Sequence, residues 1–319
     1  MSLYAAILFA SALSVDTSSP LAPTLCFDEA HHNVHTAVHG YNKFADLATA
    51  QGYILVPLRE HWTKKTLETC QLLVVVSPRG AGPDRPLKER GIPPFSSDEL
   101  SAFRNWLAPG RSFFLATDHP PIGSASRPLA DAIAVQLSDA FTEDPDRFDS
   151  ARDCIVFSRA NGGLGHHPIL EDVQSVATFL GESLVGPPGS IPLLVLGPRA
   201  IDRMRRSDGS VWLDSSPSDP TTSAAGRAQA IALVRNGARA VVLGEAGLFT
   251  SLPGQPGIST EGFENQQFAT GILRWLGSNR EVPPNPSLQR VPPGRARHRS
   301  SVRRRTCVAS ITNSAGWRR

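Results

Sequence analysis

The chain has 319 residues, of which 40% are hydrophobic and 19% are charged, an ordinary composition for a globular protein that buries one large or two modest cores. The formal net charge is +3, but residues 281–319 contain nine Arg and one Glu, so residues 1–280 carry a net charge of −5. This distribution excludes a charge-based argument for specific nucleic-acid binding by the folded body.

The first residues resemble an export signal. An apolar run at 3–13 contains Ala10-Ser11-Ala12, which looks like a cleavage site, although the charged region that normally precedes such a run is missing. We therefore predict a periplasmic or extracellular protein, with a cytoplasmic protein that starts on a plain strand as the alternative. The apolar run is too short to span a membrane, and no later run is better suited.

Composition divides the chain into three parts. Residues 1–23 are the signal-like or disordered segment, residues 24–277 form one domain, and residues 278–319 are a Pro/Arg-rich tail that we expect to be disordered. Four cysteines show no CxxC spacing. Cys26 and Cys70 adjoin apolar, strand-like runs, and we interpret them as buried small hydrophobic residues rather than as a disulfide framework.

The first half of the domain alternates strands with helices. Ser96 and Glu99 have capping-box spacing at the start of one of these helices. The predicted strands are 25–27, 53–56, 72–76 and 112–116. A predicted helix follows each of them, at 41–48, 63–69, 97–107 and 127–137. This alternation predicts an α/β fold with a mostly parallel sheet and helices on both faces.

The second half is less regular. Asn236-Gly237 lies between two apolar runs, 229–234 and 240–244, and predicts a β-hairpin. Further strands are predicted at 154–157, 175–179 and 193–196, and a last helix at 265–276.

Polar side chains cluster where three predicted strands end. The candidates for binding or catalysis are Asp28, Glu29, His31, His32, Asp118, His119 and Glu245. Because the carboxyl ends of parallel strands share one edge of a sheet, we expect His31 or His32 within about one side-chain length of Asp118 or His119. We expect His166 and His167, at the end of a glycine-rich loop, to fold over the same edge.

Two functions suit these residue types. A hydrolase would use a carboxylate and an imidazole to activate water, and a divalent metal such as Zn, Mn or Fe would assist. Glu29 and His32, or His31 and His35, would share a face on a helical turn. A binding module would use the same groups to hydrogen-bond a small polar ligand or a carbohydrate.

Each candidate also has a structural interpretation. Asp28 would cap the turn after its strand, and either His31 or His32 would be a core histidine bonded to the backbone. Glu245 would pair with Arg227 or Arg239.

The order of these motifs resembles the class I glutamine amidotransferase-like superfamily. It is similar to its uncharacterised, often exported bacterial members and to its trehalose-utilisation-type and gliding-motility/intraflagellar-transport-type domains. The motifs that carry the resemblance are 27–33, 116–119, 165–168, 226–229, 242–246 and 265–276. The resemblance implies a flavodoxin-like three-layer sandwich. Its enzymes place a Cys nucleophile after a central strand, whereas this chain has Thr117-Asp118-His119 there, which argues against glutamine hydrolysis.

Overall fold

The computed structural model describes residues 22–204, 220–252 and 257–278. Nearly all of the predicted export segment and of the basic tail lies outside these residues. The described helices are α1 (Asn42–Ala50), α2 (Lys64–Glu68), α3 (Leu87–Arg90), α4 (Ser97–Trp106), α5 (Ile122–Ala132) and α6 (Asn265–Gly277), with short 3-10 turns η1 (Pro168–Leu170) and η2 (Gly247–Phe249).

The strands divide into three sheets. The main sheet contains β1 (Thr24–Asp28), β2 (Ile54–Leu58), β3 (Leu72–Val76), β4 (Ser112–Ala116), β5 (Gln136–Leu137), β10 (Leu184–Val185), β11 (Ile191–Val195), β14 (Ala228–Arg235) and β15 (Ala238–Leu243). Two smaller sheets are formed by β6 (Ala140–Glu143), β12 (Ile201–Met204) and β13 (Thr221–Ser223), and by β7 (Phe148–Asp149), β8 (Cys154–Ser158) and β9 (Ser175–Thr178).

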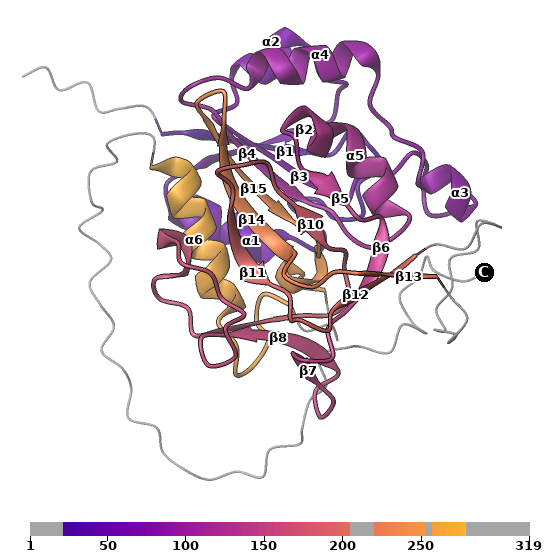
Figure 1. Ribbon diagram of the computed structural model, residues 1–319. Coiled ribbons are helices and arrows are strands. Elements are labelled where there is room, and N and C mark those ends of the chain that lie inside the picture. The colour runs from indigo at the N-terminus through magenta and orange to yellow at the C-terminus, as the bar shows by residue number, and fades with distance from the viewer. Residues whose placement is uncertain (1–21, 205–219, 253–256, 279–319) are drawn as a thin grey trace, which may run out of the picture.

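The main sheet is the middle layer of a flavodoxin-like three-layer sandwich. Its order is β2-β1-β3-β4-β15-β14-β10-β5, and β11 also pairs with β14. The five strands from β2 to β15 are parallel, whereas β14 turns back antiparallel to β15. Helices α1 and α6 cover one face, and α2, α4 and α5 cover the other (Figure 1). The predicted mostly parallel α/β fold is therefore confirmed.

Apolar side chains on both faces explain why the central strands are buried. In β3, Leu72 and Val74 point into the core under α1 and α6, while Leu73 and Val75 point into the core under α2, α4 and α5. All five residues of this strand are buried. A strand that is covered by helices on both faces is stabilised when the side chains on both faces are apolar. The continuous apolar run 72–76 predicted this strand for that reason.

Local signals placed several element ends correctly. The side chain of Ser96 accepts a hydrogen bond from the amide of Glu99, and the Glu99 side chain accepts one from the amide of Ser96, which completes the predicted capping box of α4. Asn236 and Gly237 both have positive φ and connect β14 to β15 as the predicted hairpin.

One helix prediction was wrong by several residues. The predicted helix 127–137 is replaced by α5, which begins at Ile122 and ends at Ala132. Pro128, near the start of the predicted helix, lies inside the observed one. Ala134 then adopts a left-handed conformation, and residues 136–137 form β5.

The interpretation of two cysteines was also wrong. Cys26 in β1 and Cys70, just before β3, form a disulfide, with their Cα atoms 5.4 Å apart. Both side chains are fully buried in the core under α2, α4 and α5, so the fold places them on the same side of the sheet. This proximity could not be predicted from the sequence, because the two cysteines have a sequence separation of 44.

Candidate functional site

The predicted site residues lie at the carboxyl edge of the parallel strands, and five of the seven belong to two clusters. The β1 cluster comprises Asp28, His31, His61, Trp62 and Glu99, and the β4 cluster comprises Asp118, His119, Glu182 and Glu245. Strand β3 pairs with both β1 and β4, so the ends of β1 and β4 lie roughly 10 Å apart. The seven candidates thus share an edge, but each cluster has its own hydrogen-bond network.

The β1 cluster is organised by Asp28, a fully buried carboxylate. Its Oδ1 accepts hydrogen bonds from His31 Nδ1 at 2.8 Å and from the indole Nε1 of Trp62 at 3.0 Å. Its Oδ2 accepts one from Asn33 Nδ2 at 3.0 Å. Three donors that come from two different loops fix this carboxylate, so it does more than cap its own turn.

His31 links Asp28 to a carboxylate that the sequence did not single out for the site. Its Nε2 lies 3.0 Å from Oε1 of Glu99, at the start of α4. His61 Nδ1 lies 2.9 Å from the same oxygen. Sequence reasoning recognised Glu99 only as a capping residue and overlooked His61, because 68 positions separate His31 from Glu99.

Hydrogen bonds set the pKa values in this cluster. Burial disfavours the charged form of His31, but hydrogen bonds and charges from Asp28 and Glu99 outweigh it and raise the pKa. Burial would raise the pKa of Glu99, but hydrogen bonds from the Ser96 and Trp62 amides and from His31 lower it to about 2. The imidazole ring of His31 therefore hydrogen-bonds the side chains of Asp28 and Glu99 rather than the backbone.

Glu29 and His32 lie at the same edge but take other roles. Glu29 pairs with Arg59, with 3.1 Å between Oε2 and Nε. His32 is exposed, has a φ of 47°, and its carbonyl oxygen accepts a hydrogen bond from Arg79. Residues 29–35 form no helix, so the alternative of shared helical faces for His31 and His35 is wrong.

The β4 cluster contains carboxyl groups from three separate strand ends or loops. Glu245 follows β15 and accepts hydrogen bonds from the amides of Leu180 and Gly247, at 3.0 and 2.6 Å. Glu182 accepts from the Thr117 hydroxyl at 2.9 Å. Asp118 follows β4, and its Oδ1 accepts from the amide of His119 at 2.8 Å.

Burial makes these carboxyl groups weak acids. It raises the pKa of Asp118, although amide hydrogen bonds from His119 and Ala246 partly offset this effect. Burial and the charge of Asp118 raise the pKa of Glu245 as well. Burial also raises the pKa of Glu182 well above its usual value. At neutral pH each of the three groups is therefore protonated to a greater extent than an isolated carboxyl.

His119 completes the accessible part of this cluster. Its ring stacks on Phe141, with centroids 4.5 Å apart, and its Nδ1 lies 2.9 Å from the Pro120 carbonyl oxygen. Burial lowers its pKa, so the ring is neutral at pH 7. The side chains of Asp118 and His119 are 19% and 21% exposed. Glu245, in contrast, is buried behind them.

Tyr41 and His35 are further buried groups at this edge. The Tyr41 hydroxyl donates to the carbonyl oxygen of Ala246 at 2.7 Å. Burial and the charges of Glu245 and Asp118 raise the pKa of Tyr41. His35 stacks on Tyr41, and burial lowers its pKa to about 4.

Two contact predictions were wrong. His167 lies edge-on to Trp275 near the end of α6, and Leu276 beside it accepts a hydrogen bond from Ser112 at the start of β4. His167 is therefore at the amino edge of the strands, opposite the candidate site. The arginines expected near Glu245 bind elsewhere: Arg227 pairs with Asp202, and Arg239 donates to the carbonyl of Trp275.

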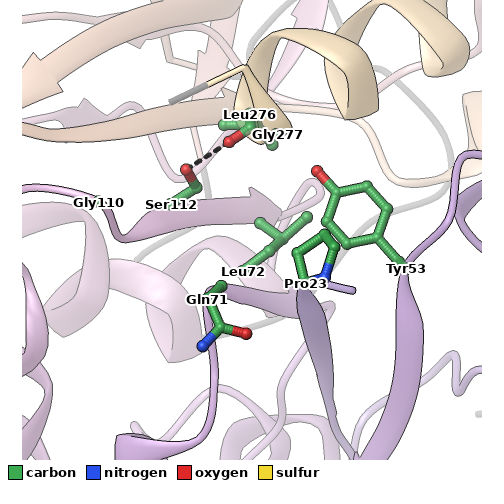
Figure 2. Close-up of a pocket in the computed structure, with 8 residues that line it drawn as sticks. All are labelled: Pro23, Tyr53, Gln71, Leu72, Gly110, Ser112, Leu276 and Gly277. Atoms are coloured by element: carbon green, nitrogen blue, oxygen red, sulfur yellow. Dashed lines mark hydrogen bonds between the residues drawn. The ribbon is translucent and has the colours of Figure 1, made fainter. Parts of the chain in front are cut away.

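Two cavities lie away from the carboxyl edge. Figure 2 shows one of about 10 Å³ between Pro23, Tyr53 and Gly277, where the Ser112 hydroxyl donates to the Leu276 carbonyl. This volume holds a single water at most. A cavity of about 140 Å³ lies between His167, Trp275 and the segment 187–191. Neither contains a predicted site residue other than His167.

The described helices include none with the length and apolarity needed to cross a bilayer. Fold and site together define an α/β protein with a flavodoxin-like sandwich and a polar carboxyl edge. No known family model matches the sequence, and no curated protein matches it.

Solved structures resemble the fold. The mmIFT52 N-terminal domain is 12% identical, and the match covers 81% of this chain and 99% of that domain with a TM-score of 0.55. A ThuA-like protein from Bacteroides uniformis is 13% identical over 81% of this chain and 92% of its own, with a TM-score of 0.43. A GMP synthase-like protein from Thermoplasma acidophilum is 8% identical over 79% and 92%, with a TM-score of 0.39. At these identities the likeness concerns the fold alone.

Proposed function

We propose that the β4 cluster binds a small polar ligand, and that a carbohydrate is the best chemical match. The observation that carries this proposal is the pairing of two partly exposed groups, Asp118 and His119, with the buried acid Glu245. A protonated carboxyl donates a hydrogen bond and a neutral imidazole accepts one. Sugar hydroxyl groups do both, so they complement such a site without requiring a charge.

The test is binding of the full chain to a panel of mono- and oligosaccharides, measured on a glycan array and then by calorimetry. Asp118→Ala and His119→Ala should each weaken binding roughly tenfold, since each removes a hydrogen-bonding group worth about 1.4 kcal/mol. Asp131→Ala, which changes an exposed acid on α5, is the control and should bind as the parent does. Equal binding by Asp118→Ala and the control, or no binding to any sugar, would refute the carbohydrate proposal.

A second candidate function is hydrolysis at the same cluster. The raised pKa values of Asp118 and Glu245 supply a general acid at neutral pH, and the lowered pKa of His119 supplies a neutral base. A panel of nitrophenyl glycosides and esters would reveal such activity. Turnover that Asp118→Asn abolishes would support hydrolysis, and turnover that this variant leaves unchanged would rule it out.

We infer that the chain is a member of the class I glutamine amidotransferase-like superfamily that does not hydrolyse glutamine. The motif order and the likeness in fold to the mmIFT52 N-terminal domain support the membership. In the turn after β4 stand Thr117, Asp118 and His119, while Cys26 and Cys70 are joined in a disulfide. Glutaminase activity of the purified chain would overturn this inference.

We also propose that the protein works outside the cytoplasm. The Cys26–Cys70 disulfide supports this location, because structural disulfides persist in oxidising compartments. Trapping of thiols in intact producing cells, followed by mass spectrometry of the peptides that contain Cys26 and Cys70, is the test. Oxidised cysteines in a periplasmic or secreted fraction support export, whereas reduced cysteines in the cytoplasm contradict it.

A further inference from the structure

Three metal-ligating side chains meet in the β1 cluster. His31 follows β1, His61 lies between β2 and α2, and Glu99 is at the first turn of α4. One ligand atom from each lies within 4.8 Å of the other two. The separations are 3.0 Å between His31 Nε2 and Glu99 Oε1, and 2.9 Å between His61 Nδ1 and the same oxygen.

The partner of the opposite ring nitrogen determines which atom His31 presents. Its Nδ1 faces the Asp28 carboxylate, which Trp62 and Asn33 hold in place. A carboxylate only accepts hydrogen bonds, so Nδ1 carries the hydrogen. Without a bound cation, the Nε2–H of His31 donates to Oε1 of Glu99. A cation at this position would displace that hydrogen and bind the lone pair of Nε2. A carboxylate behind an imidazole in this way is the arrangement that orients histidine ligands toward metals.

Both oxygens of the Glu99 carboxylate have several hydrogen-bond partners. Its Oε2 accepts hydrogen bonds from the amide and the hydroxyl of Ser96. Its Oε1 accepts from the Trp62 amide at 3.0 Å and also faces both imidazoles. Three groups thus compete for an oxygen with two lone pairs. A single cation that both imidazoles and Oε1 share would resolve this competition.

We propose that His31, His61 and Glu99 bind one divalent transition-metal ion, with Zn²⁺ the best match. Two imidazole nitrogens and one carboxylate oxygen form a common three-ligand set for zinc. Ligands about 2.1 Å from a tetrahedral ion lie roughly 3.4 Å from one another, so the two separations from Glu99 Oε1 need to widen by only a few tenths of an ångström.

The site has room for a fourth ligand. The His61 side chain is 77% exposed, whereas His31 and Glu99 are almost fully buried. The metal would therefore sit at the surface end of the cluster, with water in its fourth position. This site is separate from the β4 cluster, so the ligand-binding proposal does not depend on it.

The experiment is equilibrium dialysis of the full chain, first freed of metal with a chelator, against Zn²⁺ and against Co²⁺. Metal content is measured by elemental analysis, and the visible spectrum of bound Co²⁺ reports its geometry. The parent should bind one equivalent in a tetrahedral site. The control His166→Ala, which changes an exposed histidine remote from Glu99, should do the same.

The His61→Ala variant is decisive, because this exposed side chain can be removed without disturbing the core. It should weaken binding by tenfold or more, and Asp28→Asn by about 10- to 100-fold through the orientation of His31. Circular dichroism verifies that each variant is folded. No binding by the parent, or equal binding by the parent and His61→Ala, overturns the proposal.

Discussion

The indole Nε1 of Trp62 donates a hydrogen bond to Oδ1 of Asp28 at 3.0 Å. The backbone amide of the same residue donates to Oε1 of Glu99, also at 3.0 Å. Trp62 thus holds both acids that flank His31, although it lies in a loop and 34 positions from Asp28. The precise placement of the β1 cluster depends on this residue.

Replacement of Trp62 by Phe should lower the free energy of unfolding by roughly 1–3 kcal/mol, because Asp28 loses a buried donor to a charged acceptor. Urea denaturation measures the change. Trp275→Phe, at the opposite edge of the sheet, removes the same ring atoms at a half-buried position and should cost less. If the two variants were equally stable, the hydrogen bond to Asp28 would contribute nothing.

Loss of the Cys26–Cys70 disulfide should lower the free energy of unfolding by about 4 kcal/mol. The bond closes a long loop, with a sequence separation of 44, and so restricts the unfolded chain. The double variant Cys26→Ala, Cys70→Ala, compared with the parent by chemical denaturation, measures the effect. Reducing agent should destabilise the parent and leave the double variant unchanged. If reductant that is present until equilibrium leaves the unfolding curve of the parent unchanged, the bond contributes no stability.

Stability should fall as pH rises through the titration range of the β4 cluster. Burial and the charge of Asp118 raise the pKa of Glu245 to about 8 in the folded protein, so the folded state holds this proton more tightly than the unfolded state. The resulting stabilisation is complete below the unfolded value of about 4.5 and is lost as pH rises through the folded value.

The variant Glu245→Gln removes this titration. Its free energy of unfolding, measured by urea denaturation at each pH, should fall less than that of the parent between about pH 5 and pH 9, by at most roughly 4 kcal/mol. Glu171→Gln, an exposed acid, should follow the parent curve. Parallel curves for the parent and Glu245→Gln would mean that Glu245 ionises normally.

Replacement of Gly237 by Ala should destabilise the hairpin between β14 and β15 by about 1 kcal/mol or more. Gly237 has a φ of 76°, and an added Cβ would lie 2.8 Å from Cγ of Pro109. Gly110→Ala is a useful comparison, because its φ is also positive but nothing lies near its Cβ. Thermal unfolding should show a larger loss for Gly237→Ala, and an equal loss would rule out the contact with Pro109.

Prediction from sequence succeeded where short-range chemistry decides the structure. The capping box of Ser96 and Glu99 and the Asn236-Gly237 turn each depend on residues within a few positions. The apolar run 72–76 identified a strand buried on both sides, because a doubly covered strand needs no polar face. The order of polar strand ends then indicated the carboxyl edge as the candidate site.

Contacts between residues that are far apart in the sequence were not predicted. Nothing near Glu99 in the chain distinguishes a capping residue from one that also bonds His31 and His61, because that second role depends on how α4 packs on the sheet next to α2. The placement of His167 at the opposite edge had the same cause. Its local glycine-rich sequence allows either edge, and the packing of α6 decides between them.

The sequence by itself determined an α/β domain and the strand ends where polar groups gather. These properties follow from periodicity, capping and turn chemistry, which act over one or two turns of chain. Only the tertiary structure decided that Cys26 bonds Cys70, that His61 and Glu99 join His31, and that Asp118 and Glu245 are buried together. Each of these depends on packing across the sheet, where the burial of apolar faces brings together side chains that local sequence cannot relate.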